Sequence, residues 1–361
     1  MRKRFRYRRS YTLFRDMEKY VQGGVSSGTR LWRKTCPTAL PCSIFVKKAF
    51  GSKLVDVDGN KYIDYRLGFG PVILGHSFPA IHRAVHRADE NGLVYALDSE
   101  IELEVAKKIH NVVPCAEKVR FANSGTESTM TAIRIARGST KKEKIIKFQG
   151  HYHGHHDYLL FSTQHCRFDI CKEPASLGIP KVIGDLLFVE KWNDFEGVEK
   201  TIKQHHRKIA AIILEPVMAN ATVIPPEPGF LRHLRELCDK YNIVMIFDEV
   251  KTGFRLGLGG AQEMFHVTPD LATFAKSLGN GYPIACVAGK KEMMSMIRKG
   301  GVFHGGTYAA NPVSLTAANA TLDYLMKKDV YERSGLHGKR LMKGMEHGLQ
   351  EQKSRGIVQG Y

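Results

Sequence analysis

The chain has 361 residues, of which 43% are hydrophobic and 25% are charged, and its formal net charge at pH 7 is +18. This is the composition of an ordinary folded protein with two domains, or with one large α/β domain and an appendage. It excludes a disordered chain, a collagen and a coiled coil. The longest run without a charged side chain, residues 300–322, is too polar for a transmembrane helix, which needs about 20 apolar residues.

The N-terminal segment is basic, since its first twenty residues hold eight Lys or Arg and two acids. That charge is typical of a solvated terminus, and it leaves RNA binding, an acidic membrane surface and organelle targeting as alternatives. The seven cysteines are odd in number and form no C-x-x-C pair, which argues against a disulfide framework and a zinc ribbon. We therefore expect a protein of the reducing cytoplasm.

From about residue 50 the chain alternates short β-branched runs with helix-like stretches, the pattern of a mostly parallel sheet covered by helices. The predicted strands are 119–122, 145–148, 209–214, 243–247 and 271–275. The predicted helices are 128–137, 230–241 and 312–327. Ligands bind such sheets beyond the carboxyl ends of the strands, so we expect the functional residues there.

Two strand ends carry groups suited to a bound ligand. Residues 124–127, Ser-Gly-Thr-Glu, open a helix, and they suit either an anion site or a helix cap formed by Ser124. Residues 149–157 read Gln-Gly-His-Tyr-His-Gly-His-His-Asp. Here His151, His153 and His156 allow either a metal site, as in a zinc hydrolase, or a pocket whose ligand they hydrogen-bond. His155 stands where zinc hydrolases have Asp, which favours the second reading.

Two further strand ends carry an acid and a lysine. Asp248 suits a general base, a metal ligand, a helix cap or the counter-ion of a bound cation. Lys276 enters a glycine-rich turn, where partial desolvation lowers the pKa of an amine and makes it nucleophilic. No G-x-x-x-x-G-K-[ST] phosphate loop is present.

One ligand, pyridoxal 5′-phosphate, has the groups that these strand ends require: a phosphate, a cationic ring nitrogen and an aldehyde. Gly125 and Thr126 suit the phosphate, Asp248 the ring nitrogen and Lys276 the aldehyde. Tyr152 offers an aromatic face to the ring.

The same motifs give a family resemblance that runs nearly from end to end. The chain resembles class III pyridoxal-phosphate-dependent aminotransferases, which have an α/β fold of type I. The motifs that carry the resemblance are YVQGGVSSGTR (20–30), FANSGTESTM (121–130), KFQGHYHGHHD (147–157), FDEVKTGFR (247–255), PDLATFAKSLGNGYP (269–283) and GGTYAANP (305–312).

The resemblance implies a role for individual residues. At the cofactor it implies Ser124, Gly125, Thr126, Tyr152, Asn220, Asp248, Val250 and Lys276, with Lys276 also catalytic. It implies a homodimer in which Thr307 reaches the phosphate of the neighbouring subunit's cofactor. At the substrate it implies Ser27, Arg30, Phe69 and Glu215, with Arg30 suited to a carboxylate.

Within the family the chain is most similar to glutamate-1-semialdehyde 2,1-aminomutases. This implies intramolecular amino transfer on a small molecule, giving 5-aminolevulinate for tetrapyrrole synthesis, with a pyridoxamine 5′-phosphate form in the cycle and without metal, nucleic acid or membrane. Residues 158–180 replace the usual Gly/Ser-rich gating loop, and Phe69 replaces a Trp. These departures keep an intermolecular aminotransferase as the alternative. A zinc hydrolase and a noncatalytic, basic-tailed binding protein are the alternatives from other classes.

The resemblance also implies a division of the chain into three parts. We expect an N-terminal segment at 1–70, a large cofactor-binding domain at 71–311, and a connecting helix with the start of a small C-terminal domain at 312–361. The family continues beyond Tyr361, and residues 356–361 resemble the start of a strand. An unpaired strand exposes an edge, so we expect the small domain to be incomplete.

Overall fold

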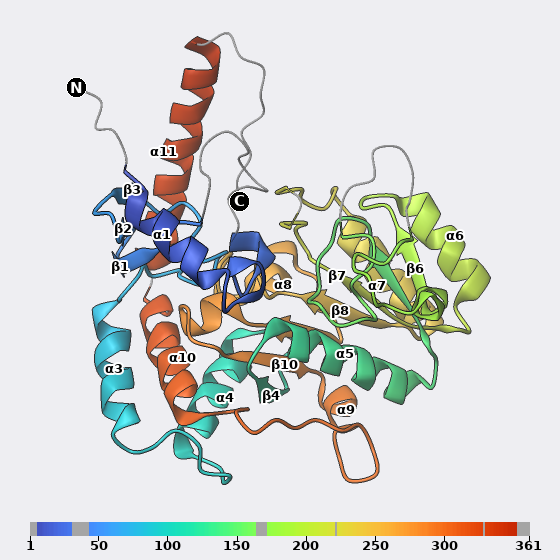
Figure 1. Ribbon diagram of the computed structural model, residues 1–361. Helices are drawn as coiled ribbons and strands as arrows, with labels where there is room; N and C mark the ends of the chain where they lie inside the picture. Colours follow the sequence, from blue (N-terminus) through green and yellow to red (C-terminus); the bar gives the residue numbers. More distant parts are fainter. Residues whose placement is uncertain (1–5, 31–42, 164–171, 221, 328, 352–361) are drawn as a thin grey trace. The chain divides into compact units, whose positions relative to one another are not determined.

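The structure is a computed structural model that describes residues 6–30, 43–163, 172–220, 222–327 and 329–351 (Figure 1). The chain divides into two compact units, residues 1–82 and 83–361. The expected strand at 356–361 lies outside the described residues, as does part of the 158–180 loop, and the three-part domain division stays a prediction. In the described part of the chain, every helix is too short or too polar to cross a membrane.

The first unit contains a small antiparallel sheet of three strands in the order β1 (Val46–Phe50), β2 (Lys53–Asp56) and β3 (Lys61–Ile63). The turn between β2 and β3 caps helix α1 (Arg8–Met17), because the Asp58 carboxylate accepts hydrogen bonds from the N–H groups of Arg9 and Ser10 at 2.7 and 2.9 Å. The basic N-terminal segment is therefore helical over Arg8–Met17. Two short 3₁₀ turns, η1 (Gln22–Gly24) and η2 (Gly28–Arg30), follow.

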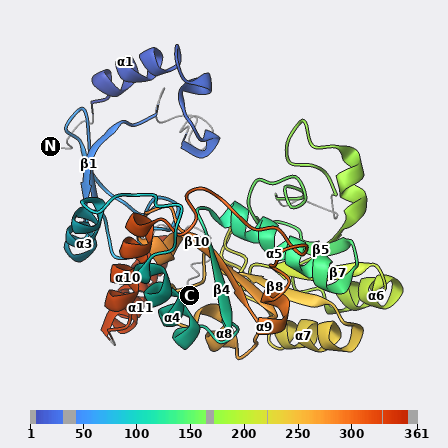
Figure 2. The ribbon, with the colours of Figure 1, turned by 90° about the horizontal axis from the view of Figure 1, so that it is seen from below.

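The second unit is built on a sheet of seven strands in the order β4-β10-β9-β8-β7-β5-β6 (Figure 2). Strand β10 runs antiparallel to both of its neighbours, and the remaining pairs are parallel. This confirms the predicted fold class. The strands are β4 (Lys118–Ala122), β5 (Lys144–Phe148), β6 (Leu187–Glu190), β7 (Ile209–Leu214), β8 (Val244–Asp248), β9 (Leu271–Phe274) and β10 (Ala285–Gly289).

Helices cover both faces of this sheet. In β5, Ile145 and Phe148 are three residues apart and so point to opposite faces. Ile145 belongs to the core cluster that includes residues of α5, whereas Phe148 meets Phe230 of α7 edge to face. From residue 79 on, the described helices are α3 (Pro79–Asp89), α4 (Glu100–Val112), α5 (Gly125–Thr140), α6 (Phe195–His205), α7 (Phe230–Tyr241), α8 (Gly260–Phe265), α9 (Lys291–Met294), α10 (Pro312–Leu325) and α11 (Asp329–Glu351), with 3₁₀ turns η3 (Lys181–Leu186) and η4 (Lys276–Gly279).

The register of the central strands brings their carboxyl ends to one edge. Leu214 of β7 pairs with Phe247 of β8, and Asp248 of β8 pairs with Thr273 of β9. Residues that follow these strands therefore leave the sheet at the same edge, which is where the sequence predicts the functional groups.

Candidate active site

The N-terminus of α5 is closed by a capping box. Ser124 Oγ accepts a hydrogen bond from the N–H of Glu127 at 3.3 Å, and Glu127 Oε2 accepts one from the N–H of Ser124 at 3.1 Å. Helix α5 therefore begins three residues before the predicted helix at 128–137. The cap exists alongside any anion site, because the backbone N–H groups of the first turn still point out of the helix end. The phosphate role of Ser124, Gly125 and Thr126 stays a prediction.

The loop after β5 lies against this helix end. Thr129 Oγ1 donates to the carbonyl of His153 at 2.7 Å, and the N–H of His155 donates to Thr126 Oγ1 at 3.3 Å. Gly154 adopts a φ of +94°, and a Cβ added there would lie 2.6 Å from Thr126 Oγ1. Only glycine fits at this close approach between the loop and the helix.

Gly154→Ala is expected to lower the free energy of unfolding by at least about 3 kcal/mol, because backbone strain and a steric clash with Thr126 add. Gly178→Ala is the matched control, since Gly178 has a φ of +88° and open space around it. The control is expected to cost only about 1 kcal/mol, the strain alone. Urea denaturation of both variants measures the difference, and equal losses would contradict the close packing of the loop.

Asp248 is 3% exposed and is held by three hydrogen bonds. Its Oδ1 accepts from the N–H of Val250 at 3.1 Å and from Thr273 Oγ1 at 3.3 Å. Its Oδ2 lies 2.7 Å from His153 Nδ1, which donates to it. Thr273 is not identified by the sequence motifs, which predict His153 in the site without its partner. The carboxylate is therefore fixed in position at the end of β8.

Val250 forms a contact between β8 and the helix end. A Cβ added at Gly125 would lie 3.0 Å from Val250 Cγ2, and Val250 packs on a small cluster formed by Ala122, Ala275 and Ala285. These alanines come from the ends of β4 and β9 and from β10. The ends of four strands thus meet around Val250.

Lys276 begins the 3₁₀ turn η4, separated from the end of β9 by Ala275, and has a φ of +40°. Burial lowers the pKa of its amine, the carboxylates of Asp248 and Glu215 raise it, and the cations of Lys251 and Arg255 lower it further. In the described part of the chain the Lys276 amine makes no hydrogen bond. A desolvated amine without a partner is a ready nucleophile.

Glu215 joins three segments at the end of β7 and is 3% exposed. Its Oε1 accepts from the N–H of Tyr152 at 2.8 Å, its Oε2 accepts from the N–H of Ala219 at 3.1 Å, and Lys251 Nζ lies 3.9 Å from Oε2. Burial raises the pKa of this carboxyl, and Lys251 opposes that rise. Glu215 therefore holds the backbone of Tyr152, whose side chain is 36% exposed.

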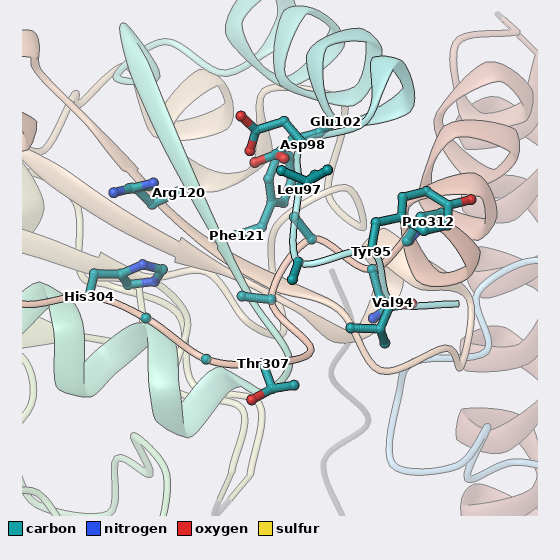
Figure 3. A pocket seen from close by; sticks show the side chains of 16 residues that line it. Val94, Tyr95, Leu97, Asp98, Glu102, Arg120, Phe121, His304, Thr307 and Pro312 are labelled. Atoms are coloured by element: carbon teal, nitrogen blue, oxygen red, sulfur yellow. The ribbon is translucent and has the colours of Figure 1, made fainter. Parts of the chain in front are cut away.

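The contacts described above do not include the remaining predicted site residues. Asn220 is exposed, one residue after Ala219. Thr307 lines a separate cavity of about 400 Å³ together with Val94 and Leu97 (Figure 3). Ser27, Arg30 and Phe69 belong to the first compact unit, and their part in the site stays a prediction.

The histidines of the 149–157 loop are engaged with the protein. His151 Nδ1 accepts a hydrogen bond from the N–H of Glu215 at 2.9 Å, and His153 Nδ1 donates to Asp248. Among the residues that the structure describes, no three His, Cys, Asp or Glu side chains gather as a metal-binding group. The geometry therefore does not assemble His151, His153 and His156 into the ligand set of a zinc hydrolase.

The side chains and the helix end of this site match the chemical groups of pyridoxal phosphate. The fixed carboxylate of Asp248 matches a cationic ring nitrogen, and the amine of Lys276, which has no hydrogen-bond partner among the described residues, matches an aldehyde. The 16-residue helix α5 presents its positive end, which suits a phosphate. Tyr152 and Val250 supply the apolar groups expected at the two faces of a planar ring.

Comparisons with known proteins agree with this arrangement. The family described as aminotransferase class-III matches residues 36–360. A glutamate-1-semialdehyde 2,1-aminomutase of Ignicoccus hospitalis is 46% identical over 341 residues, which cover 94% of this chain and 78% of that relative. The solved structure of an omega-transaminase from Sphaerobacter thermophilus has a TM-score of 0.91 and 34% identity, covering 97% of this chain and 80% of that one. A transaminase solved with PLP bound has a TM-score of 0.91 and 28% identity, covering 97% and 81% of the two chains. The chain belongs to the class-III aminotransferase family.

Proposed function

We propose that the chain converts glutamate 1-semialdehyde to 5-aminolevulinate by intramolecular amino transfer with pyridoxal phosphate. The similarity to an aminomutase, 46% identity over 94% of the chain, carries this proposal. The geometry supports it, because an amine, a carboxylate and a helix end meet at one edge of the sheet.

When bound, pyridoxal phosphate supplies an aldehyde that bonds amines and a ring that withdraws electrons from the attached carbon. The chain's own groups then have separate tasks. Asp248 holds a proton on the ring nitrogen through its negative charge, and His153 fixes the orientation of that carboxylate. Lys276 Nζ would move a proton between the reacting substrate carbon and the cofactor carbon that bears the transferred nitrogen. The first turn of α5 binds the phosphate.

The substrate carboxylate is assigned to Ser27 and Arg30, on the family resemblance alone. A guanidinium group binds a carboxylate through two parallel hydrogen bonds, which orients the substrate chain. Phe69 is assigned to the wall of the substrate pocket, where it replaces the bulkier Trp of aminomutases.

The active form is proposed to be a homodimer in which Thr307 reaches the partner's cofactor phosphate. The cavity beside Thr307 is bordered by exposed apolar side chains, with Val94 43% and Leu97 83% exposed (Figure 3). Exposed apolar groups around a cavity are typical of an interface.

Sedimentation is expected to give twice the 40.6-kDa chain mass. Thr307→Ala is expected to weaken pyridoxal phosphate binding about tenfold, the loss of one charge-assisted hydrogen bond. A monomer that binds the cofactor as tightly as the dimer would contradict this assignment.

The test of the proposed function is conversion of glutamate 1-semialdehyde as the single substrate. The purified protein with pyridoxamine phosphate is expected to form 5-aminolevulinate with no second amino donor or acceptor. A strict requirement for a keto acid would overturn the aminomutase assignment. That result would favour an intermolecular aminotransferase, which the similarity to an omega-transaminase supports as the second candidate.

A further inference from the structure

Lys251 is a second lysine in the site, three residues after Asp248 in the turn that follows β8. Its side chain is 26% exposed, and its Nζ lies 3.9 Å from Glu215 Oε2. Burial lowers the pKa of this amine, while Glu215 and Asp248 raise it. The proposed function gives Lys251 no task, although it stands among the groups that do the chemistry.

The two carboxylates of the site are both occupied by groups other than Lys276. Asp248 accepts from His153, Thr273 and the N–H of Val250. Glu215 accepts from the N–H groups of Tyr152 and Ala219 and pairs with Lys251. Within the described residues, Lys276 therefore has no carboxylate at ion-pair distance.

We propose that Lys251 is a positioning residue that engages Glu215 and thereby keeps the Lys276 amine free to react with the cofactor aldehyde. The inference rests on the proposed function only in giving Lys276 that reaction. It assigns to Lys251 a task that a neutral side chain of the same length does not perform.

The charges that face Lys276 give the direction in which its pKa moves when Lys251 is replaced. They are Asp248 at the end of β8, Glu215 at the end of β7, and Lys251 and Arg255 in the turn after β8. Arg255 is held beside the lysine by a hydrogen bond from its Nη2 to Ser277 Oγ at 3.1 Å. Loss of the Lys251 cation leaves the negative charge of Glu215 without its ion-pair partner. Because the Lys251 cation itself lowers the pKa of Lys276, its loss raises that pKa and favours the protonated amine.

The test uses the rate at which the cofactor-free protein reacts with pyridoxal phosphate, followed over a range of pH by the visible absorption band of the product. In Lys251→Met the midpoint of the pH profile is expected to move upward by about one pH unit, which slows the reaction about tenfold at pH values below the wild-type midpoint. Lys251→Arg retains the charge and is expected to keep the wild-type profile. Lys251→Gln repeats the test if the methionine variant does not fold.

A profile that is the same in wild type and Lys251→Met overturns the inference, because a purely structural role for Lys251 does not move a pH midpoint. Equal shifts in Lys251→Met and Lys251→Arg also overturn it, since the charge is then not the cause. Failure of the proposed function looks different. In that case the wild-type chain forms no band at any pH, and both the assignment of Lys276 and the inference fall.

Discussion

Replacement of Lys276 with alanine is expected to remove the visible absorption band that forms with pyridoxal phosphate and to lower the rate of 5-aminolevulinate formation at least about 10³-fold. The alanine variant loses both the amine that bonds the cofactor aldehyde and the base that moves the substrate proton. The folded state is expected to keep its stability without cofactor, because a partly buried cation with no hydrogen bond in the described structure costs desolvation energy and returns little.

Lys118→Ala is the matched control for this prediction. Lys118 is exposed at the start of β4, in the same sheet but at the opposite end of its strands. The control is expected to keep both the band and the rate. A band that persists in Lys276→Ala would contradict the assignment and would indicate that another amine of the site, such as that of Lys251, bonds the aldehyde. Absorption spectra of the two variants, recorded with equal cofactor, measure the difference.

The strands of the central sheet could be predicted because apolar β-branched residues dominate them. Strand β7 reads Ile-Ala-Ala-Ile-Ile-Leu and is buried throughout, and its predicted ends agree with the structure. Strand β10 reads Ala-Cys-Val-Ala-Gly, which has little intrinsic preference for a strand. It forms because β4 and β9 pair with it on both sides, an effect of distant segments that local sequence does not carry.

Local sequence likewise predicts some residues of the site but not the contacts between them. Asp248 and Lys276 follow recognisable strands, so the rule that ligands lie beyond strand ends identifies them. The hydrogen-bond partners of Asp248 are not evident from the sequence. Thr273 reaches Asp248 through the register of neighbouring strands, and His153 reaches it through a loop that folds over α5. Glu215 was predicted at the end of β7, but its contacts with two backbone N–H groups depend on how that loop turns. Strand ends can be located from sequence, whereas hydrogen bonds across the sheet edge require the tertiary structure.

Asp248→Asn is expected to lower the turnover rate by about 10²-fold or more while the protein stays folded. The amide has the shape of the carboxyl group, and its oxygen can still accept from the N–H of Val250 and from Thr273. The negative charge that holds a proton on the ring nitrogen is lost, so the ring withdraws electrons less strongly. His153 then faces an N–H₂ group, and its Nδ1 must change from donor to acceptor.

Asp270→Asn separates this effect from the general cost of removing a buried acid. Asp270 is 8% exposed and pairs with Arg235 and Lys290 at 2.9 and 2.6 Å, away from the proposed chemistry. Its replacement is expected to lower the free energy of unfolding by about 1–3 kcal/mol and to leave the turnover rate near that of wild type. Asp248→Asn is expected to keep the free energy of unfolding and to lower the turnover rate, because the hydrogen bonds of residue 248 survive and its negative charge does not. If both variants instead lose stability and keep their turnover rate, Asp248 is a structural acid and the ring nitrogen has another partner. Denaturation and single-substrate kinetics on the same preparations decide between these outcomes.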